Sequence, residues 1–132
     1  MFEMFQKVEF EDVDLYGIIH HPKILYYCER VRTSFFEEKG IVLSHLPCGF
    51  IITKISAEYK APLKMHDRIR ICQSVHRVRD YKFILKYRLM KDDKLMVAAI
   101  MDFVVIDLMT KNVMALPENI SGILNSCREA QQ

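Results

Sequence analysis

Alternating hydrophobic and polar residues predict that most of this chain forms strands. Apolar side chains between Ile51 and Tyr59 alternate with Lys54, Ser56 and Glu58, which is the period of a strand with one buried face. The same period recurs twice further on, and a later segment is apolar on both faces, as a central strand would be. Short polar turns separate these segments, so the pattern indicates an antiparallel sheet. The strands predicted in this way cover residues 50–60, 68–79, 81–90 and 95–106.

The beginning of the chain predicts a short strand followed by a long helix. From Lys7 to Glu11 charged and apolar residues alternate, so we expect a strand there that stops before Asp12. Gly17 allows a tight turn, and Pro22 favours the first turn of a helix. Apolar residues then recur every three or four positions until Gly40, which is typical of a helix end. The predicted helix has about 17 residues and is about 26 Å long.

The helix is amphipathic, and a second short helix is expected near the end of the sequence. The apolar side of the long helix consists of Ile24, Tyr27, Cys28, Val31 and Phe35. Pro117 opens the second, shorter amphipathic segment. Asp102 interrupts an apolar strand, and a buried carboxylate needs a partner. It therefore lies at a subunit interface, at the wall of a pocket or beside an arginine, and we favour the pair with an arginine.

Length and composition indicate one ordinary globular domain. The chain has 132 residues, of which 51% are hydrophobic and 27% charged, so we expect a single domain over residues 1–132. A net charge of +2 gives no indication of nucleic-acid binding. The sequence shows neither a secretory signal nor an apolar run of about 18 residues, which predicts a cytoplasmic protein without a transmembrane segment.

The cysteines give no indication of a metal or a disulfide. Cys28, Cys48, Cys72 and Cys127 are scattered without C-x-x-C spacing, and we expect them to be small buried hydrophobic residues. We therefore predict neither a metal site nor a cofactor.

The segment between the first strand and the helix carries the candidate chemistry. Unpaired N–H groups in the first turn of a helix, here around His20 and His21, stabilise negative charge. Asp12 or Asp14 lies just upstream and could act as a nucleophile or base, which is the combination that acyl transfer requires. The alternative is that both aspartates only form the turn.

These residues also resemble a known family. The order E-D-V-D-L-Y-G-I-I-H-H-P, followed by Y-Y-C-E-R-V-R and K-G-I, resembles the hotdog-fold acyl-CoA thioesterases of the hydroxybenzoyl-CoA thioesterase type. It is closest to the Tol-Pal-associated, YbgC-like branch. The resemblance implies an α+β hotdog fold, in which a curved antiparallel sheet of about five strands wraps around one long central helix. It also implies hydrolysis of acyl thioesters and a place in lipid metabolism.

The resemblance assigns a role to each residue of the motif. It places the catalytic carboxylate at Asp14, as nucleophile or general base, with Asp12 and Gly17 shaping the turn. It gives His21 the backbone N–H that polarises the thioester carbonyl. The chain departs from the branch pattern in two places: Lys23 and Ile24 replace Asn and Tyr, and His20 stands where an aromatic residue is usual. These departures leave the preferred acyl group open.

The expected partners are an acyl-CoA or acyl-carrier-protein thioester and further copies of the chain. Arg77, Arg79 and Lys82 cluster at one hairpin, where the resemblance suggests contacts to the phosphates of CoA; charged hairpins also simply keep sheet edges soluble. One helix can cover only one face of the sheet, so we expect a homodimer that assembles into a tetramer, with active sites at the dimer interface. A hotdog hydratase or dehydratase and a non-catalytic acyl-thioester-binding protein are the alternative functions.

Overall fold

A single antiparallel sheet makes up most of the structure, which is a computed structural model describing residues 1–129. Its five strands follow the order β1-β3-β4-β5-β2. The four long strands predicted from the two-residue period are confirmed. The strand bounds are β1 Phe2–Lys7, β2 Cys48–Tyr59, β3 Arg68–Val78, β4 Lys82–Lys91 and β5 Lys94–Asp107.

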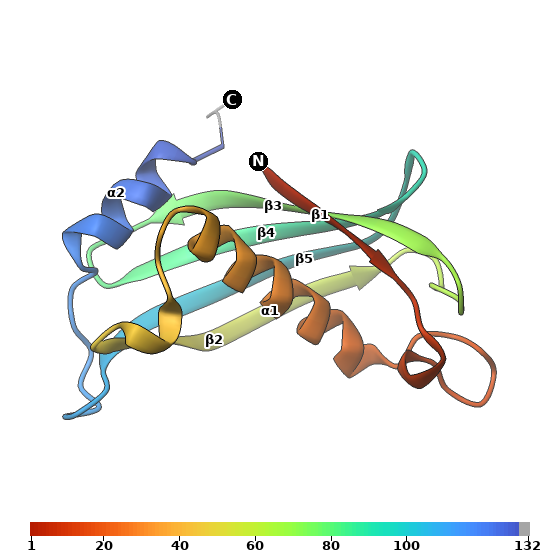
Figure 1. The fold of residues 1–132 in the computed structure, drawn as a ribbon, viewed down its shortest axis with the longest axis horizontal. Coiled ribbons are helices and arrows are strands. Elements are labelled where there is room, and N and C mark those ends of the chain that lie inside the picture. Colours follow the sequence, from red (N-terminus) through yellow and green to blue (C-terminus); the bar gives the residue numbers. More distant parts are fainter. Residues whose placement is uncertain (130–132) are drawn as a thin grey trace.

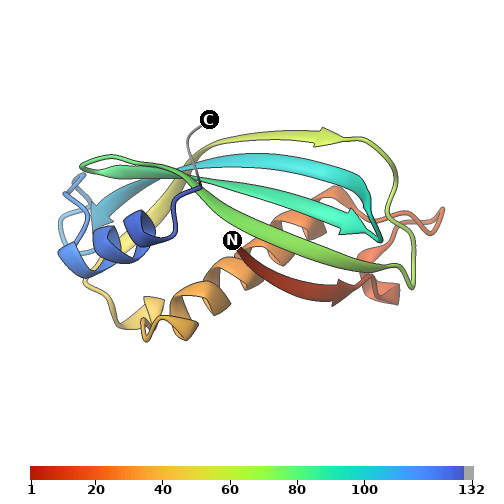
Figure 2. The ribbon, with the colours of Figure 1, turned by 90° about the horizontal axis from the view of Figure 1, so that it is seen from above.

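One long helix, α1, crosses one face of this sheet, and the sheet curves around it (Figures 1 and 2). The helix spans His21–Glu38, which agrees with the prediction of a helix starting near Pro22. Its end is set by Gly40, whose φ of +83° lies in the left-handed region that glycine adopts without strain. The predicted α+β arrangement of one long helix against one curved sheet is therefore confirmed.

The prediction of a strand over residues 7–11 is wrong. The first strand lies earlier and ends at Lys7, and a short 3-10 turn, Phe10–Asp12, takes the place of the predicted strand end. In this turn Glu9 and Asp12 cap each other reciprocally, which bends the chain away from the sheet. Phe10 consequently points to solvent, whereas Val8 is buried as its position in the pattern suggested.

The core fills the space between α1 and the inner face of the sheet. All five residues of the predicted apolar stripe of α1 are buried. Phe36 and, unexpectedly, Arg32 are buried as well. The sheet contributes alternate residues, for example Phe83, Leu85, Tyr87 and Leu89 of β4, which are completely buried.

A second helix, α2 (Glu118–Ser126), follows Pro117 as predicted and lies near the turn that joins β3 to β4 (Figure 1). Its buried residues are Ile120 and Leu124. The expectation that Asp102 pairs with an arginine is wrong, because the cation near its carboxylate is Lys82, 4.0 Å away. Lys82 lies diagonally across the β4–β5 pair from Asp102, and the Asp102 side chain retains 21% of its exposure, so water still solvates it.

The strand β2 is an edge of the sheet and is unusually exposed for its apolar content. It pairs only with β5, and its other edge faces away from the sheet. Ile51, Ile52, Ile55 and Tyr59 are between 40% and 49% exposed. A long apolar edge strand of this kind is a surface that proteins normally cover.

Candidate active site

A tight turn between the first strand and α1 carries the candidate carboxylate. Val13 and Ile19 form an antiparallel bridge across the base of this turn. Gly17 has a φ of +74°, which a residue with a Cβ adopts only with strain. The tip is formed by Leu15 and Tyr16, which are 92% and 82% exposed.

Asp14 is held in this turn by backbone amides. Its Oδ1 accepts hydrogen bonds from the N–H of Tyr16 at 2.8 Å and from the N–H of Ile18 at 3.2 Å. Within residues 1–129 its second oxygen, Oδ2, takes part in no hydrogen bond or ion pair. The carboxylate is exposed on the surface of the protomer. Asp14 is thus oriented by one oxygen and leaves the other available for chemistry.

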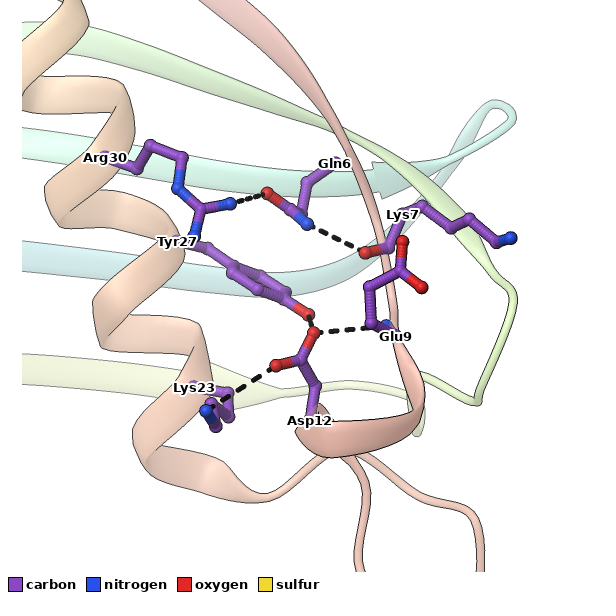
Figure 3. Close-up of polar contacts among 7 residues, drawn as sticks. All are labelled: Gln6, Lys7, Glu9, Asp12, Lys23, Tyr27 and Arg30. Atoms are coloured by element: carbon purple, nitrogen blue, oxygen red, sulfur yellow. Dashed lines mark hydrogen bonds and ion pairs between the residues drawn. The ribbon is translucent and has the colours of Figure 1, made fainter.

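Asp12 has the opposite environment, because its carboxylate is buried and fully engaged (Figure 3). The Tyr27 hydroxyl of α1 donates to its Oδ2 at 2.5 Å, and the N–H of Glu9 donates to the same oxygen at 3.1 Å. The ammonium of Lys23, also on α1, lies 3.6 Å from Oδ1. These contacts attach the turn to the first two turns of the helix.

The contacts also change the titration of both partners. Burial alone would raise the pKa of Asp12, but the hydrogen bonds from Tyr27 and Glu9 and the charge of Lys23 together lower the pKa below its ordinary value. Burial and the neighbouring carboxylate raise the pKa of Tyr27, so its hydroxyl stays protonated and donates. Asp12 is therefore a stably ionised structural anchor.

The start of α1 lies directly beside this turn. The N–H of His20 donates to the carbonyl of Asp12 at 2.8 Å, so that amide is already occupied. The next amide, that of His21, is the first of the helix and donates to no other backbone group in the described part of the chain. The imidazole of His21 packs edge-on against the ring of Tyr59 at the end of β2, with 4.8 Å between ring centroids.

His21 and Tyr59 line a pocket of about 280 Å³. Most of its wall is apolar, and Ile18, whose N–H holds Asp14, belongs to it. The structure thus brings together three of the predicted features: the Asp14 turn, the Gly17 bend and the start of α1 at His21. The remaining lining residues are Ile19, Ile24, Lys60, Ala61, Pro62, Leu63 and Val97.

The predicted basic hairpin lies at the other end of the sheet (Figure 1). Arg79 and Lys82 line a groove of about 930 Å³ between the β3–β4 turn and α2, which we call the basic groove. Tyr81, Ser121 and Asn125 also line it. Arg77 is exposed on β3 but is not part of this groove.

Two features of the site lay outside the sequence prediction. Tyr27 was assigned only to the apolar stripe of the helix. In the sequence, the hydrogen bond from its hydroxyl to Asp12 is indicated only by the presence of an aromatic residue one turn after Lys23. Tyr59 was assigned only to a strand face. Its role at the pocket depends on which end of β2 reaches the helix start, and a local pattern does not contain that information.

Burial argues against three of the four cysteines as nucleophiles. Cys28, Cys48 and Cys72 are buried as expected, and Cys127 is partly buried. Burial raises the pKa of the Cys28 thiol to about 12, which keeps it protonated.

Within residues 1–129 no three His, Cys, Asp or Glu side chains are grouped so that they could hold a metal ion. In the same range no helix is long and apolar enough to cross a membrane.

Comparison with known proteins identifies the family. Residues 8–124 match the model of the thioesterase-like superfamily, and the chain belongs to this family. The acyl-CoA thioesterase YbgC of Haemophilus influenzae is 22% identical over 120 residues, which cover 88% of each chain. The YbgC proteins of two Helicobacter pylori strains are 28% identical, and the match spans 59% of their length.

Solved structures show the same fold. The 1,4-dihydroxy-2-naphthoyl-CoA thioesterase Slr0204 from Synechocystis superposes with a TM-score of 0.87 at 18% identity, covering 94% of this chain and 95% of that one. A hypothetical protein from Aquifex aeolicus superposes with a TM-score of 0.89 at 22% identity, covering 94% and 99%. The predicted thioesterase superfamily and hotdog fold are confirmed, and the names of the relatives agree with the predicted class of thioester hydrolases. The association with the Tol-Pal system stays a prediction.

Proposed function

We propose that this protein hydrolyses acyl-CoA thioesters, with Asp14 as the catalytic carboxylate and the His21 amide as the oxyanion donor. The observation that carries this proposal is a connection through Ile18, which lines the same 280 Å³ pocket as His21 and donates its N–H to Asp14. Asp14 itself is not a lining residue and lies one hydrogen bond from the pocket wall. The thioester carbonyl would enter between Asp14 and the His21 amide. Family membership supports hydrolysis in preference to hydration. A thiol-release assay separates hydrolysis from a hydratase or dehydratase activity and from acyl-thioester binding without catalysis.

The chemistry follows from the two groups. Asp14 Oδ2 attacks the thioester carbon, or removes a proton from a water that attacks it, and the carbonyl oxygen gains negative charge. The His21 N–H, at the positive end of the α1 dipole, stabilises that charge, which is typically worth about 3 kcal/mol for one donor. The C–S bond then breaks, and the CoA thiolate takes up a proton that comes from the water consumed. If Asp14 attacks directly, this water next cleaves the acyl–Asp14 anhydride and restores the carboxylate; if Asp14 is the base, the attacking water has already supplied the new oxygen of the acid.

The pocket suggests which acyl groups are accepted. Its walls are largely aliphatic, with His21 and Tyr59 as the aromatic residues. The ammonium of Lys60, which also lines the pocket, pairs with Glu58 at 3.0 Å, so an uncharged acyl group is favoured over a charged one. At about 30 Å³ per water-sized group, 280 Å³ holds roughly nine such groups. Acyl chains of up to about eight carbons, or a single aromatic ring, fit this space.

The exposed edge strand suggests how the site is completed. We infer a dimer in which two copies of β2 pair antiparallel about a two-fold axis, which would cover the exposed isoleucines of both strands. Antiparallel pairing places the Cys48 end of one β2 beside the Tyr59 end of the other. The basic groove of the second copy would then approach the His21 pocket of the first, and its Arg79 and Lys82 cations suit the phosphates of CoA. Further pairing of dimers into a tetramer belongs to the same proposal.

A thiol-release assay over a panel of acyl-CoA thioesters tests the proposal. The parent protein should release free CoA from short and medium acyl or single-ring aroyl substrates, and Asp14→Asn should reduce kcat by at least about a hundredfold because the carboxylate is lost. Asp93→Asn, an exposed change in the β4–β5 turn, is the matched control and should behave as the parent. Equal turnover by Asp14→Asn and the parent would refute the assignment of Asp14. Saturable acyl-CoA binding without thiol release would favour a binding protein instead.

A further inference from the structure

A second cavity lies at the opposite end of α1 from the candidate active site. It has a volume of about 270 Å³ and shares no lining residue with the His21 pocket. The start of β1, the last turn of α1, the middle of β3 and the end of α2 meet around it (Figures 1 and 2). Its lining residues are Met1, Phe2, Phe35, Glu38, Lys39, Gln73, Val75, Ser126 and Cys127.

A buried amide with an unused donor lines this cavity. Gln73 of β3 lies on the inner face of the sheet, like Val75, and is 1% exposed. Its Oε1 accepts a hydrogen bond from the Tyr87 hydroxyl at 2.7 Å. Its Nε2 has no hydrogen-bond partner within residues 1–129. A buried polar group without a partner is uncommon in a folded protein, and here it belongs to the wall of a cavity.

A buried cation strengthens that donor. Arg32 of α1 donates from Nη1 to the Tyr87 hydroxyl at 3.2 Å, and its guanidinium stacks over Phe103 with 4.7 Å to the ring centroid. In the described part of the chain Arg32 forms no ion pair with a carboxylate. The hydrogen bonds therefore run in one direction, from Arg32 through Tyr87 to Gln73. This polarises the Gln73 amide so that its N–H groups become better donors.

The rim and walls define the rest of the ligand. Phe2, Phe35 and Val75 provide apolar walls. The rim disfavours an anion, because it contains the Glu38 carboxylate and the negative dipole ends of α1 and α2. The ammonium of Lys39 offsets part of this effect. An acceptor oxygen is therefore favoured at Gln73, and a net negative charge is not.

We propose that this cavity is a second binding site, for a small uncharged molecule with a carbonyl oxygen at one end and an apolar body of about six carbons. The carbonyl oxygen accepts from Gln73 Nε2, and the apolar body lies against Phe35 and Val75. A cavity of 270 Å³ has room for roughly nine water-sized groups, which matches a molecule of that size. The proposal does not depend on thioester hydrolysis.

Binding of hexanamide, followed by the ¹⁵N–¹H signal of the Gln73 side-chain amide, tests this site. Hexanamide should shift that signal in a saturable way, and hexanoate, which has the same apolar body and a negative charge, should bind at least about tenfold more weakly. Gln73→Leu should weaken hexanamide binding by about tenfold or more, because the donor is lost. This variant lacks the Gln73 side-chain signal, so its binding is followed by the backbone ¹⁵N–¹H signal of Val75, which lines the same cavity. Since the readout needs no substrate turnover, failure of the proposed hydrolase activity would leave the result interpretable.

A second variant tests the cavity without changing the hydrogen bonds between Arg32, Tyr87 and Gln73. Ser126→Trp should block the rim from the exposed side and abolish binding, whereas Asn119→Trp, exposed on the same helix but away from the cavity, should bind as the parent does. The proposal is overturned if Ser126→Trp binds as tightly as the parent, or if hexanamide shifts only signals of the His21 pocket. Hexanoate binding as tightly as hexanamide would overturn the assignment of an uncharged ligand.

Discussion

Two aspartates separated by one residue have different tasks because their surroundings differ. Asp12 is buried and receives a hydroxyl, an amide and an ammonium group, so its carboxylate is committed to holding the turn on α1. Asp14 is exposed and is oriented by two amides through one oxygen. A carboxylate that holds structure needs complete pairing, whereas one that attacks a substrate needs a free oxygen. On this basis Asp12 and Asp14 should respond differently to the same substitution.

Asp12→Asn should destabilise the fold by about 2 kcal/mol, since hydrogen bonds to a buried charged group contribute about 1.5–3 kcal/mol. Urea unfolding measures this loss. Asp14→Asn is the matched control and should change the free energy of unfolding by less than about 0.5 kcal/mol, because its side chain is exposed. Equal losses for the two variants would contradict the assignment of Asp12 as the anchor.

The same anchor should appear in the pH dependence of stability. The pKa of Asp12 is lower in the folded protein than its ordinary value of 3.8, so its contribution is complete above about pH 4 and is lost as the pH falls through the folded value. Asp12→Asn should therefore flatten the acid side of the stability profile and leave its neutral part parallel to that of the parent. Chemical denaturation at a series of pH values below 5 measures this difference.

Tyr59 should limit the size of the acyl group. Tyr59→Ala removes a wall of the His21 pocket, so the ratio of kcat/KM for a ten-carbon to a six-carbon acyl-CoA should rise by about tenfold. Tyr59→Phe keeps the ring against His21 and should retain the preference of the parent. An unchanged chain-length preference in Tyr59→Ala would mean that another surface limits the acyl group.

At the scale of whole elements, the strands and helices with a regular hydrophobic period could be predicted from the sequence. Strand β1, which lacks such a period, could not. From Phe83 to Leu89 the residues of β4 alternate between buried and less buried positions, as the two-residue period predicted. The alternation breaks at Met90, which is also buried and lies at a register shift, and Tyr81, expected on the buried face, is 49% exposed. In β1 the exposed Phe5 stands where the period would place a polar residue, so the alternation after it, from Lys7 to Glu11, looked more strand-like. The capping of Glu9 with Asp12, a contact between side chain and backbone, ended the strand instead.

The site could be predicted only as far as it is local in sequence. The Gly17 bend, the two aspartates and the helix start lie within ten residues, so a motif is enough to bring them together. The contact of His21 with Tyr59 and the bonds between Arg32, Tyr87 and Gln73 join distant segments. They depend on the order and register of the strands, which the two-residue period does not specify.

Two glycines allow a matched test of element geometry. Gly17→Ala should cost about 1–2 kcal/mol of stability and lower kcat, because φ is +74° there although no atom lies within 4 Å of the new Cβ. Gly122→Ala, inside α2 with equally open space and no positive φ, should stabilise the protein by about 0.5–1 kcal/mol. Thermal unfolding and the thiol-release assay measure both variants. Stabilisation by Gly17→Ala would show that the turn does not hold the left-handed conformation.

At the scale of the whole molecule, one group of exposed apolar residues lies along the β2 edge of the sheet. The isoleucines of β2 are on the edge strand, and Leu15 and Tyr16 form the tip of the turn that carries Asp14. One α1 helix is not enough to cover both the core and this edge. Pairing through β2 would cover the edge and place a second copy next to the candidate site, so assembly and activity should be lost together.

Ile55→Asp is the change that should separate the subunits, because it places a charge on the inner face of the edge strand where the second copy would lie. Light scattering coupled to size exclusion should show the parent as a dimer or tetramer and this variant as a monomer. Thiol release by the variant should fall by at least about tenfold, because the basic groove of the second copy is lost. Val113→Asp, equally drastic and also exposed but in the connection between β5 and α2, is the matched control and should leave assembly and activity as in the parent. A folded, fully active monomer of Ile55→Asp would show that one chain carries the complete site. A variant that assembles like the parent would show that β2 is not the surface through which copies pair.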